Sequence, residues 1–191
     1  MQRKKEEEAI VLDYLQNGYP FDNRPMHIKT AIVQAIGKEN YTLLELVPRK
    51  GVYLQSNETV YIGDAKRDKI HHINGRIPIS KLTGTAKSNM KSVIEELVKK
   101  HEPMFIEFFN KAQPISTRTH VLELLPGVGK KHMWEIIEER KVKPFESFAD
   151  IRARVKLMPD PITTIIKRII SELEGNEKHY LFVDRPSDRI D

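Results

Sequence analysis

The residue types best suited to bind a ligand lie together in one segment that reads Leu-Leu-Pro-Gly-Val-Gly-Lys-Lys. Pro126 and Gly127 suit the centre of a type II turn, because proline fixes φ near −65° and glycine adopts the positive φ that follows. Gly129 then opens an expected helix without a side chain, so the first amides of that helix keep unsatisfied N–H donors. These donors, the positive end of the helix dipole and the ammonium groups of Lys130 and Lys131 together favour phosphate binding.

Two helices must position this turn. Residues 117–124 favour a short helix before it, and residues 130–140 favour a second helix after it. Val128 is the single apolar side chain within the turn, so we expect it to pack between the two helices.

The segment resembles the helix-hairpin-helix motif, in which a leucine precedes Pro-Gly, a hydrophobic residue, a glycine and a second helix rich in isoleucine. In this chain Leu125 stands before Pro-Gly, and Ile136 and Ile137 lie in the second helix. Met133 stands where the family usually has alanine, so we expect the two helices to sit slightly farther apart.

The resemblance spans about 25 residues and implies contact with the sugar–phosphate backbone that is largely independent of base sequence. The residues implied are those of the turn, its two lysines and two flanking cations: Gly127, Val128, Gly129, Lys130, Lys131, Arg118 and Lys143. The alternative is an ordinary pair of helices in a protein that touches no nucleic acid.

A second copy of the pattern follows. Residues 158–162, with isoleucines at 169 and 170, align with residues 125–129 and the isoleucines at 136 and 137. The second copy lacks both glycines, so we expect it to act as a structural partner of the first hairpin. Several cations could still give it a weaker phosphate-facing side: Arg152, Arg154, Lys156, Lys167 and Arg168. Before it, Ser147 and Asp150 have the spacing of a capping box.

The first part of the chain reads as short strands separated by turn residues. The expected strands cover residues 9–15, 28–36, 41–47, 59–62 and 70–79, the last folded back at Asn74-Gly75. Their number and spacing favour a small closed barrel that resembles an OB-fold. Such barrels often bind single strands in a groove lined by aromatic and basic side chains. The candidates here are Tyr53, Tyr61, Lys66, Arg67, Lys69 and Arg76. A solvated charged loop with tyrosines in the core is the alternative.

The predicted fold class is α+β. From residue 82 the apolar spacing becomes helical, with Ser88 or Asn89 as the expected cap of one helix and Pro103 as the break before the next. The expected organisation is an OB-like barrel at 1–84, a helical connector at 85–113, a tandem helix-hairpin-helix domain at 114–175 and a polar tail at 176–191. We expect the apolar patch of the tail, residues 180–183, to dock on the body.

Composition narrows the function classes. The chain has 191 residues, a formal net charge of +5 and a pI of about 9.3, which favours polyanionic partners. The lack of cysteine excludes disulfides, thiolate zinc sites, iron–sulfur clusters and thiol nucleophiles. His71 and His72 are adjacent, so on a strand they point to opposite faces, and we expect no metal site and no cofactor. No apolar run is long enough for a membrane span, and the start lacks a signal peptide's apolar region, so we expect a cytoplasmic protein without membrane contact.

An enzymatic alternative comes from the same motif. Helix-hairpin-helix DNA glycosylases with lyase activity carry a lysine nucleophile on the second helix of the hairpin, and Lys131 falls at that position. They also carry a later aspartate, which Asp150 superficially matches. The chain has no room for their larger helical body, and the capping box explains Asp150 better. We therefore expect no catalytic residue.

As a whole the chain resembles an archaeal family of uncharacterised proteins that joins an OB-like barrel to a helix-hairpin-helix region and is predicted to bind nucleic acid. The resulting hypothesis is a non-catalytic protein that binds the nucleic-acid backbone through the hairpin turn. The barrel would add a second nucleic-acid surface or dock a protein. A protein-interaction scaffold in a ribonucleoprotein or repair complex is the alternative. DNA and RNA, single and double strands, the oligomeric state and the pathway all stay open.

Overall fold

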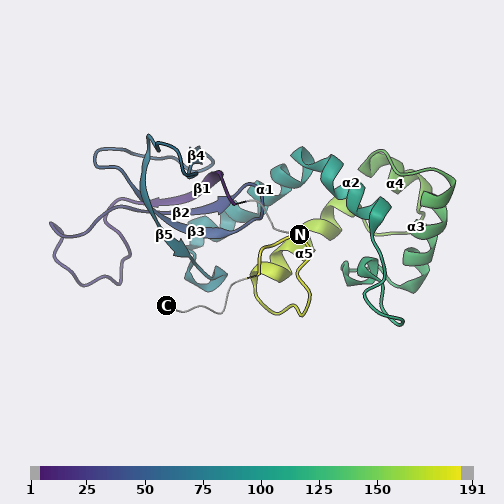
Figure 1. Cartoon of the computed structure of the whole chain (residues 1–191). Coiled ribbons are helices and arrows are strands. Elements are labelled where there is room, and N and C mark those ends of the chain that lie inside the picture. The colour runs from purple at the N-terminus through teal and green to yellow at the C-terminus, as the bar shows by residue number, and fades with distance from the viewer. Residues whose placement is uncertain (1–4, 186–191) are drawn as a thin grey trace. The chain divides into compact units, whose positions relative to one another are not determined.

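The computed structural model describes residues 5–185 as an α+β structure (Figure 1). The strands are β1 (Glu8–Leu15), β2 (Ile32–Gly37), β3 (Leu43–Pro48), β4 (Thr59–Tyr61) and β5 (Ile70–Arg76). The α-helices are α1 (Gly84–Lys100), α2 (Glu102–Lys111), α3 (Lys130–Val142), α4 (Phe148–Arg154) and α5 (Pro161–Leu173). Two short 3-10 helices, η1 (Ile79–Lys81) and η2 (Val121–Leu124), complete the set.

The described chain divides into two compact units. One comprises residues 94–170 and the other comprises the remaining residues on both sides of that range. This division differs from the predicted domains, because α1 and α5 each contribute residues to both units. The sheet, the first part of α1 and the end of the chain form one unit, and the helices within residues 94–170 form the other.

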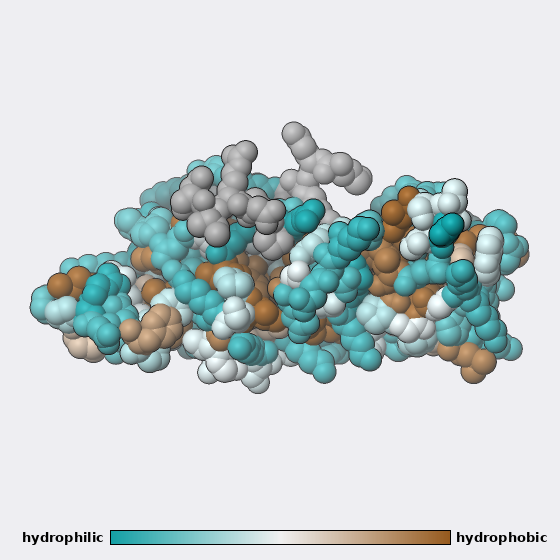
Figure 2. Space-filling model, turned by 90° about the horizontal axis from the view of Figure 1, so that it is seen from below, coloured by the Kyte–Doolittle hydropathy of each residue, from teal (hydrophilic) through white to brown (hydrophobic). Residues whose placement is uncertain are grey.

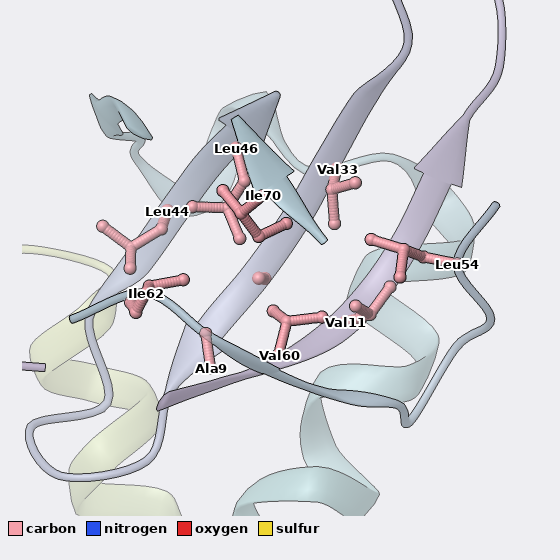
Figure 3. Packing of buried hydrophobic residues seen from close by; sticks show 10 residues of the cluster. Ala9, Val11, Val33, Leu44, Leu46, Leu54, Val60, Ile62 and Ile70 are labelled. Atoms are coloured by element: carbon pink, nitrogen blue, oxygen red, sulfur yellow. The ribbon is translucent and has the colours of Figure 1, made fainter. Parts of the chain in front are cut away.

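The sheet is antiparallel throughout, with the strand order β4-β1-β2-β3-β5. It curls into a half-barrel, and among residues 5–185 no pairing joins β4 to β5. The predicted closed barrel is therefore wrong in its closure, although all five predicted strand regions contain a strand. Ten buried apolar residues fill the concave side, including Val11, Val33, Leu46 and Ile70 (Figure 3).

The predicted hairpin at Asn74-Gly75 is wrong. Both residues lie inside β5, which pairs with β3 along its length. Gly75 has φ +144° beside a register shift at Glu45 and Leu46. The glycine therefore allows the irregular backbone at this point of the β3–β5 pairing. The predicted second strand is also too long, because residues 25–29 form turns in the long β1–β2 connection, which extends beyond the strands (Figure 1).

A buried carboxylate on β3 links that strand to β5 and to the segments that precede β2 and follow β5. Glu45 on β3 is 7% exposed, and it accepts hydrogen bonds from the Tyr19 hydroxyl at 2.5 Å and the Asn74 amide at 2.8 Å. The Lys81 ammonium lies 2.9 Å from the same carboxylate. Burial raises the pKa of Glu45, but the hydrogen bonds from Tyr19, Asn74 and Lys81 outweigh it and hold the pKa below the ordinary 4.5.

The lowered pKa of Glu45 makes the stability of the fold depend on pH in the acid range. A carboxyl whose pKa is lowered in the folded state stabilises the fold above its ordinary pKa, and that contribution is lost as the pH falls through the folded value. We expect the free energy of unfolding to drop between about pH 5 and pH 3, and Glu45→Gln to flatten that drop, as measured by urea unfolding across the pH range. Glu107→Gln is the control, because the ion pair of Glu107 with Lys111 is exposed. Equal pH dependence of Glu45→Gln and the wild type would contradict the assignment.

The predicted docking of the tail is confirmed within the unit that contains the sheet. Phe182 and Val183 are buried, and the Asp184 amide donates to the Asn40 carbonyl at 3.4 Å. The carboxylate of Glu172, at the end of α5, is fully buried. It accepts the amides of Leu181, Phe182 and Val183 at 2.7, 2.9 and 2.8 Å.

Helix α1 begins earlier than predicted. Thr83 is the residue before it, and its hydroxyl accepts the Ala86 amide at 3.1 Å while donating to Asp13 at 2.6 Å. Ser88 and Asn89 therefore lie inside α1. The predicted break at Pro103 is confirmed, because α1 ends at Lys100 and α2 begins at Glu102. Pro103 occupies the first turn of α2, where its missing N–H costs nothing.

The predicted capping box of α4 is half confirmed. The Ser147 hydroxyl accepts the Asp150 amide at 3.0 Å, as expected. The Asp150 carboxylate accepts the Glu146 amide at 3.1 Å instead of the Ser147 amide, and it pairs with Arg154.

Candidate nucleic-acid interface

The turn between η2 and α3 has the backbone that the sequence predicts. Gly127 has φ +81°, and the Val128 amide donates to the Leu125 carbonyl at 3.0 Å. Leu125 and Val128 are buried, so both apolar residues of the motif anchor the turn. A Cβ on Gly127 would stand 2.8 Å from Cγ of Pro159 in the second hairpin, so both φ and space require glycine here.

Helix α3 begins without a side-chain cap. Gly129 is the N-cap residue, with φ −87° and ψ −178°, and it is exposed. The first intrahelical bond runs from the Met133 amide to the Gly129 carbonyl at 2.9 Å. The amides of Lys130, Lys131 and His132 therefore precede the helical ladder, and no side chain within residues 5–185 caps them.

Lys130 and Lys131 are exposed at the same end of α3. Over the described part of the chain, neither ammonium forms an ion pair. Trp134, the chain's single tryptophan, follows on the next turn of α3 with 58% of its surface exposed. An uncapped helix start, two free cations and an exposed aromatic ring thus occupy adjacent turns of one helix.

The turn before α5, where the sequence predicts the second hairpin, differs at the equivalent place. Asp160 precedes the first residue of α5, and its carboxylate accepts the amide and the hydroxyl of Thr163, both at 2.9 Å. Asp160 therefore corresponds to Gly129, whereas the sequence alignment pairs it with Gly127. The left-handed position of the second turn is filled by Leu157, with φ +65°. The Thr163 amide of α5 is therefore capped, whereas the equivalent His132 amide of α3 is open.

Two polar side chains hold the first turn in place, in roles that the sequence does not predict. His120 precedes η2, where its Nδ1 accepts the Leu122 amide at 3.1 Å and the Glu123 carboxylate accepts the His120 amide at 2.8 Å. Burial lowers the pKa of His120, which keeps Nδ1 available as an acceptor. Arg168 of α5 is buried and donates to the Leu124 carbonyl at 2.9 Å. The usual N-cap residues are Ser, Thr, Asp and Asn, so the sequence does not indicate that His120 caps η2.

The two predicted flanking cations lie in different places. Arg118 is exposed in a turn closed by hydrogen bonds from Ile115 and Ser116 to Thr119. Lys143 follows the last residue of α3, so about 20 Å of helix separates it from Lys130. Its ammonium lies 3.0 Å from Glu146. Lys143 therefore does not flank the turn.

The cations of the second hairpin are mostly engaged with protein. Arg154 donates to the backbone carbonyls of Glu139 and Lys143, and so closes the end of α3. Arg152 pairs with Asp160 at 2.5 Å, and the buried Arg168 supports the first turn. Lys156 and Lys167 are exposed. The predicted weak phosphate-facing side thus loses its three arginines.

The barrel candidates do not gather into one site. Arg67 donates to the Gly63 carbonyl at 2.8 Å, Lys69 pairs with Glu58, and Arg76 pairs with Asp184 at 2.5 Å. The Tyr61 hydroxyl accepts the Ala65 amide at 3.2 Å, a structural contact. Lys66 is exposed, and so is Tyr53, at 70%.

The two residues of the lyase alternative lie on different helices, Lys131 in the first turn of α3 and Asp150 in the first turn of α4. Asp150 is bound to Arg154, which donates to Glu139. Glu139 lies eight residues after Lys131, about 12 Å along the helix axis. Within residues 5–185, no group of three or more acidic or histidine side chains could hold a metal ion. In the same range, every helix is too short or too polar to cross a membrane.

Comparisons with known proteins find one family and two relatives that match almost the whole chain. A family model described as a protein of unknown function, DUF655, matches residues 5–184. The uncharacterized protein MJ0038 of Methanocaldococcus jannaschii is 46% identical over 183 residues, which is 95% of this chain and 81% of that protein. The crystal structure of Af1531 from Archaeoglobus fulgidus superposes with a TM-score of 0.86 at 46% identity, over 94% of this chain and 100% of that chain.

Proposed function

The chain belongs to the DUF655 family, and we propose that it is a non-catalytic nucleic-acid-binding protein that holds the sugar–phosphate backbone at the start of α3. In this proposal, the open amides of Lys130, Lys131 and His132 bind one phosphate, and the two ammonium groups neutralise it or its neighbour. Because these contacts reach only the backbone, binding is largely independent of base sequence.

The observation that carries the proposal is the contrast between the two hairpins. Each turn leads into a helix of 13 residues, but only in α5 does the N-cap side chain cap a first-turn amide, that of Thr163. Capping is the ordinary way to satisfy such donors, and its absence beside two exposed lysines leaves an anion-binding end. The hairpin pair supports the tandem helix-hairpin-helix interpretation, and the order β1-β2-β3-β5 with β4 beside β1 supports the OB-like one.

A protein-interaction scaffold is the second candidate function. The long β1–β2 connection exposes Phe21, Met26 and Ile28 at 72%, 63% and 50% of their surfaces. Figure 2 shows apolar patches separated by hydrophilic side chains on one face of the molecule. In this case, free DNA and RNA would bind no more tightly than heparin.

The double variant Lys130→Ala, Lys131→Ala tests the proposal. We expect it to weaken binding about tenfold at low salt and to reduce the salt slope by about 1.8 on duplex DNA, because each lost phosphate contact removes about 0.9. The effect should be equal on unrelated sequences. Fluorescence anisotropy at several salt concentrations measures it, and Trp134 provides an intrinsic signal one helical turn from the lysines.

A matched pair on the same unit provides the control. Lys156 and Lys167 are exposed cations on the second hairpin, where the helix start is capped. Replacing both with alanine removes the same total charge, and we expect a smaller loss of affinity. If the two double variants lose affinity equally, bulk charge and not the turn drives binding, and the proposal fails. A borohydride-trapped adduct of Lys131 on abasic DNA would instead support the lyase.

A further inference from the structure

A groove of about 560 Å³ lies on the half-barrel, and none of the cations that the sequence analysis selected there lines it. Its walls come from the end of β1, both ends of the β1–β2 connection, the turn after β3 and the start of β5. The volume falls within the range of small-ligand sites. Tyr53 is the one sequence-selected residue that lines it.

The groove is electrostatically one-sided. Its lining includes Lys29, Arg49, Lys50, His71 and His72, and no aspartate or glutamate. The whole chain carries 27 acidic residues among 191, so their complete absence from a lining of this size is uncommon. Low-dielectric walls and charges of one sign raise the local concentration of an anion in such a cleft.

The turn after β3 fixes the cations at the rim. The Arg49 amide donates to the Lys69 carbonyl at 2.8 Å, and its guanidinium donates to the Arg67 carbonyl at 2.8 Å. Gly51 has φ +79°, and the Val52 amide donates to the Arg49 carbonyl at 3.0 Å, which closes the turn. Lys50, at the tip of this turn, is exposed and forms no ion pair in the described chain.

Two tyrosines provide an aromatic wall. Tyr14 and Tyr53 meet edge to face, with ring centroids 6.2 Å apart and planes at 65°. The Tyr14 hydroxyl donates to the Val52 carbonyl at 3.3 Å, which fixes its ring. Tyr53 packs on that ring by an edge and leaves 70% of its surface open, so a planar group can stack on it.

We propose that this groove binds a single-stranded segment of nucleic acid, with one base stacked on Tyr53 and the adjoining phosphates held by Lys50, Arg49 and Lys29. An exposed aromatic ring beside cations is the combination that binds single strands without sequence preference. A duplex keeps its bases paired and offers none to Tyr53. The site goes beyond the proposed function of the hairpin turn, because it lies on the other unit and stands or fails independently.

The test compares Tyr53→Ala with Phe21→Ala on the full chain. Phe21 is equally exposed, at 72%, and stacks on Tyr19 outside the groove. We expect Tyr53→Ala to weaken binding of an oligothymidylate of about ten nucleotides about tenfold, with duplex binding unchanged. Phe21→Ala should leave both affinities unchanged. Unaltered melting temperatures confirm that the variants fold.

Two further measurements distinguish this groove from the turn site and from a site for free nucleotides. In the Lys130→Ala, Lys131→Ala background, the Tyr53 effect should persist, so failure of the turn site does not remove it. Inorganic polyphosphate and AMP serve as competitors that lack, respectively, the base and the strand. Equal single-strand affinity of Tyr53→Ala and the wild type overturns the proposal. So does a mononucleotide that binds as tightly as the oligonucleotide, because the groove then serves a free nucleotide.

Discussion

Gly129→Asp should weaken nucleic-acid binding about a hundredfold while raising the melting temperature by about 2 °C. The two effects have one cause. Gly129 already has the extended backbone of an N-cap residue, and a Cβ there would meet no atom within 4 Å. An aspartate can therefore place its carboxylate at the open start of α3, as Asp160 does when it accepts the Thr163 amide of α5.

The gain in stability is small, and the loss of binding is large. Replacing glycine by aspartate at an N-cap adds a few tenths of a kcal/mol, with about 0.5 kcal/mol more from the helix dipole. The same carboxylate occupies the donors meant for a phosphate, repels it, and neutralises part of the charge of Lys130 and Lys131. Two lost charge-assisted hydrogen bonds of about 1.5 kcal/mol each correspond to the expected hundredfold loss.

Thermal unfolding and anisotropy on the same preparation check both halves of this prediction. Gly129→Ala is the matched control, because it adds a Cβ without a carboxylate and leaves the amides open. Gly84→Asp adds the same charge at another exposed position where a Cβ is unobstructed. Stabilisation of Gly129→Asp with unchanged affinity would show that phosphate does not bind at this helix end.

The sequence predicts the first turn well because its requirements are local. A positive φ at Gly127 and a bare helix start at Gly129 follow from residue types within a few positions of each other. Asn74-Gly75 fails for the opposite reason. The dipeptide has the local preference of a hairpin, but pairing of β5 with β3 over the whole strand overrides it.

The supporting polar groups could not be predicted, because their partners lie far away in the sequence. Glu45 reaches Tyr19, 26 residues earlier, and Asn74, 29 residues later. Arg168 reads as a surface cation on an amphipathic helix, yet it is 3% exposed and supports Leu124. The groove could not be predicted for the same reason, because its cations come from segments that only the curled sheet brings together.

Glu172 shows how much stability one such group can carry. Glu172→Ala should lower the free energy of unfolding by about 3 kcal/mol and the melting temperature by about 10 °C. The carboxylate is fully buried and accepts three consecutive amides of the tail. Alanine leaves those donors without this acceptor, and each buried, unsatisfied N–H costs about 1 kcal/mol or more.

The variant should also release the tail. Without the acceptor, the amides of residues 181–183 form hydrogen bonds with water only when the tail detaches. Detachment exposes Phe182 and Val183 to protease. Limited proteolysis with chymotrypsin, followed by mass spectrometry, should cut Glu172→Ala after Phe182 under conditions where the wild type is protected. Glu174→Ala, an exposed acid just beyond α5, should behave like the wild type. If Glu172→Ala keeps both the protection and the melting temperature, the three hydrogen bonds do not hold the tail, and packing of Phe182 and Val183 alone must do so.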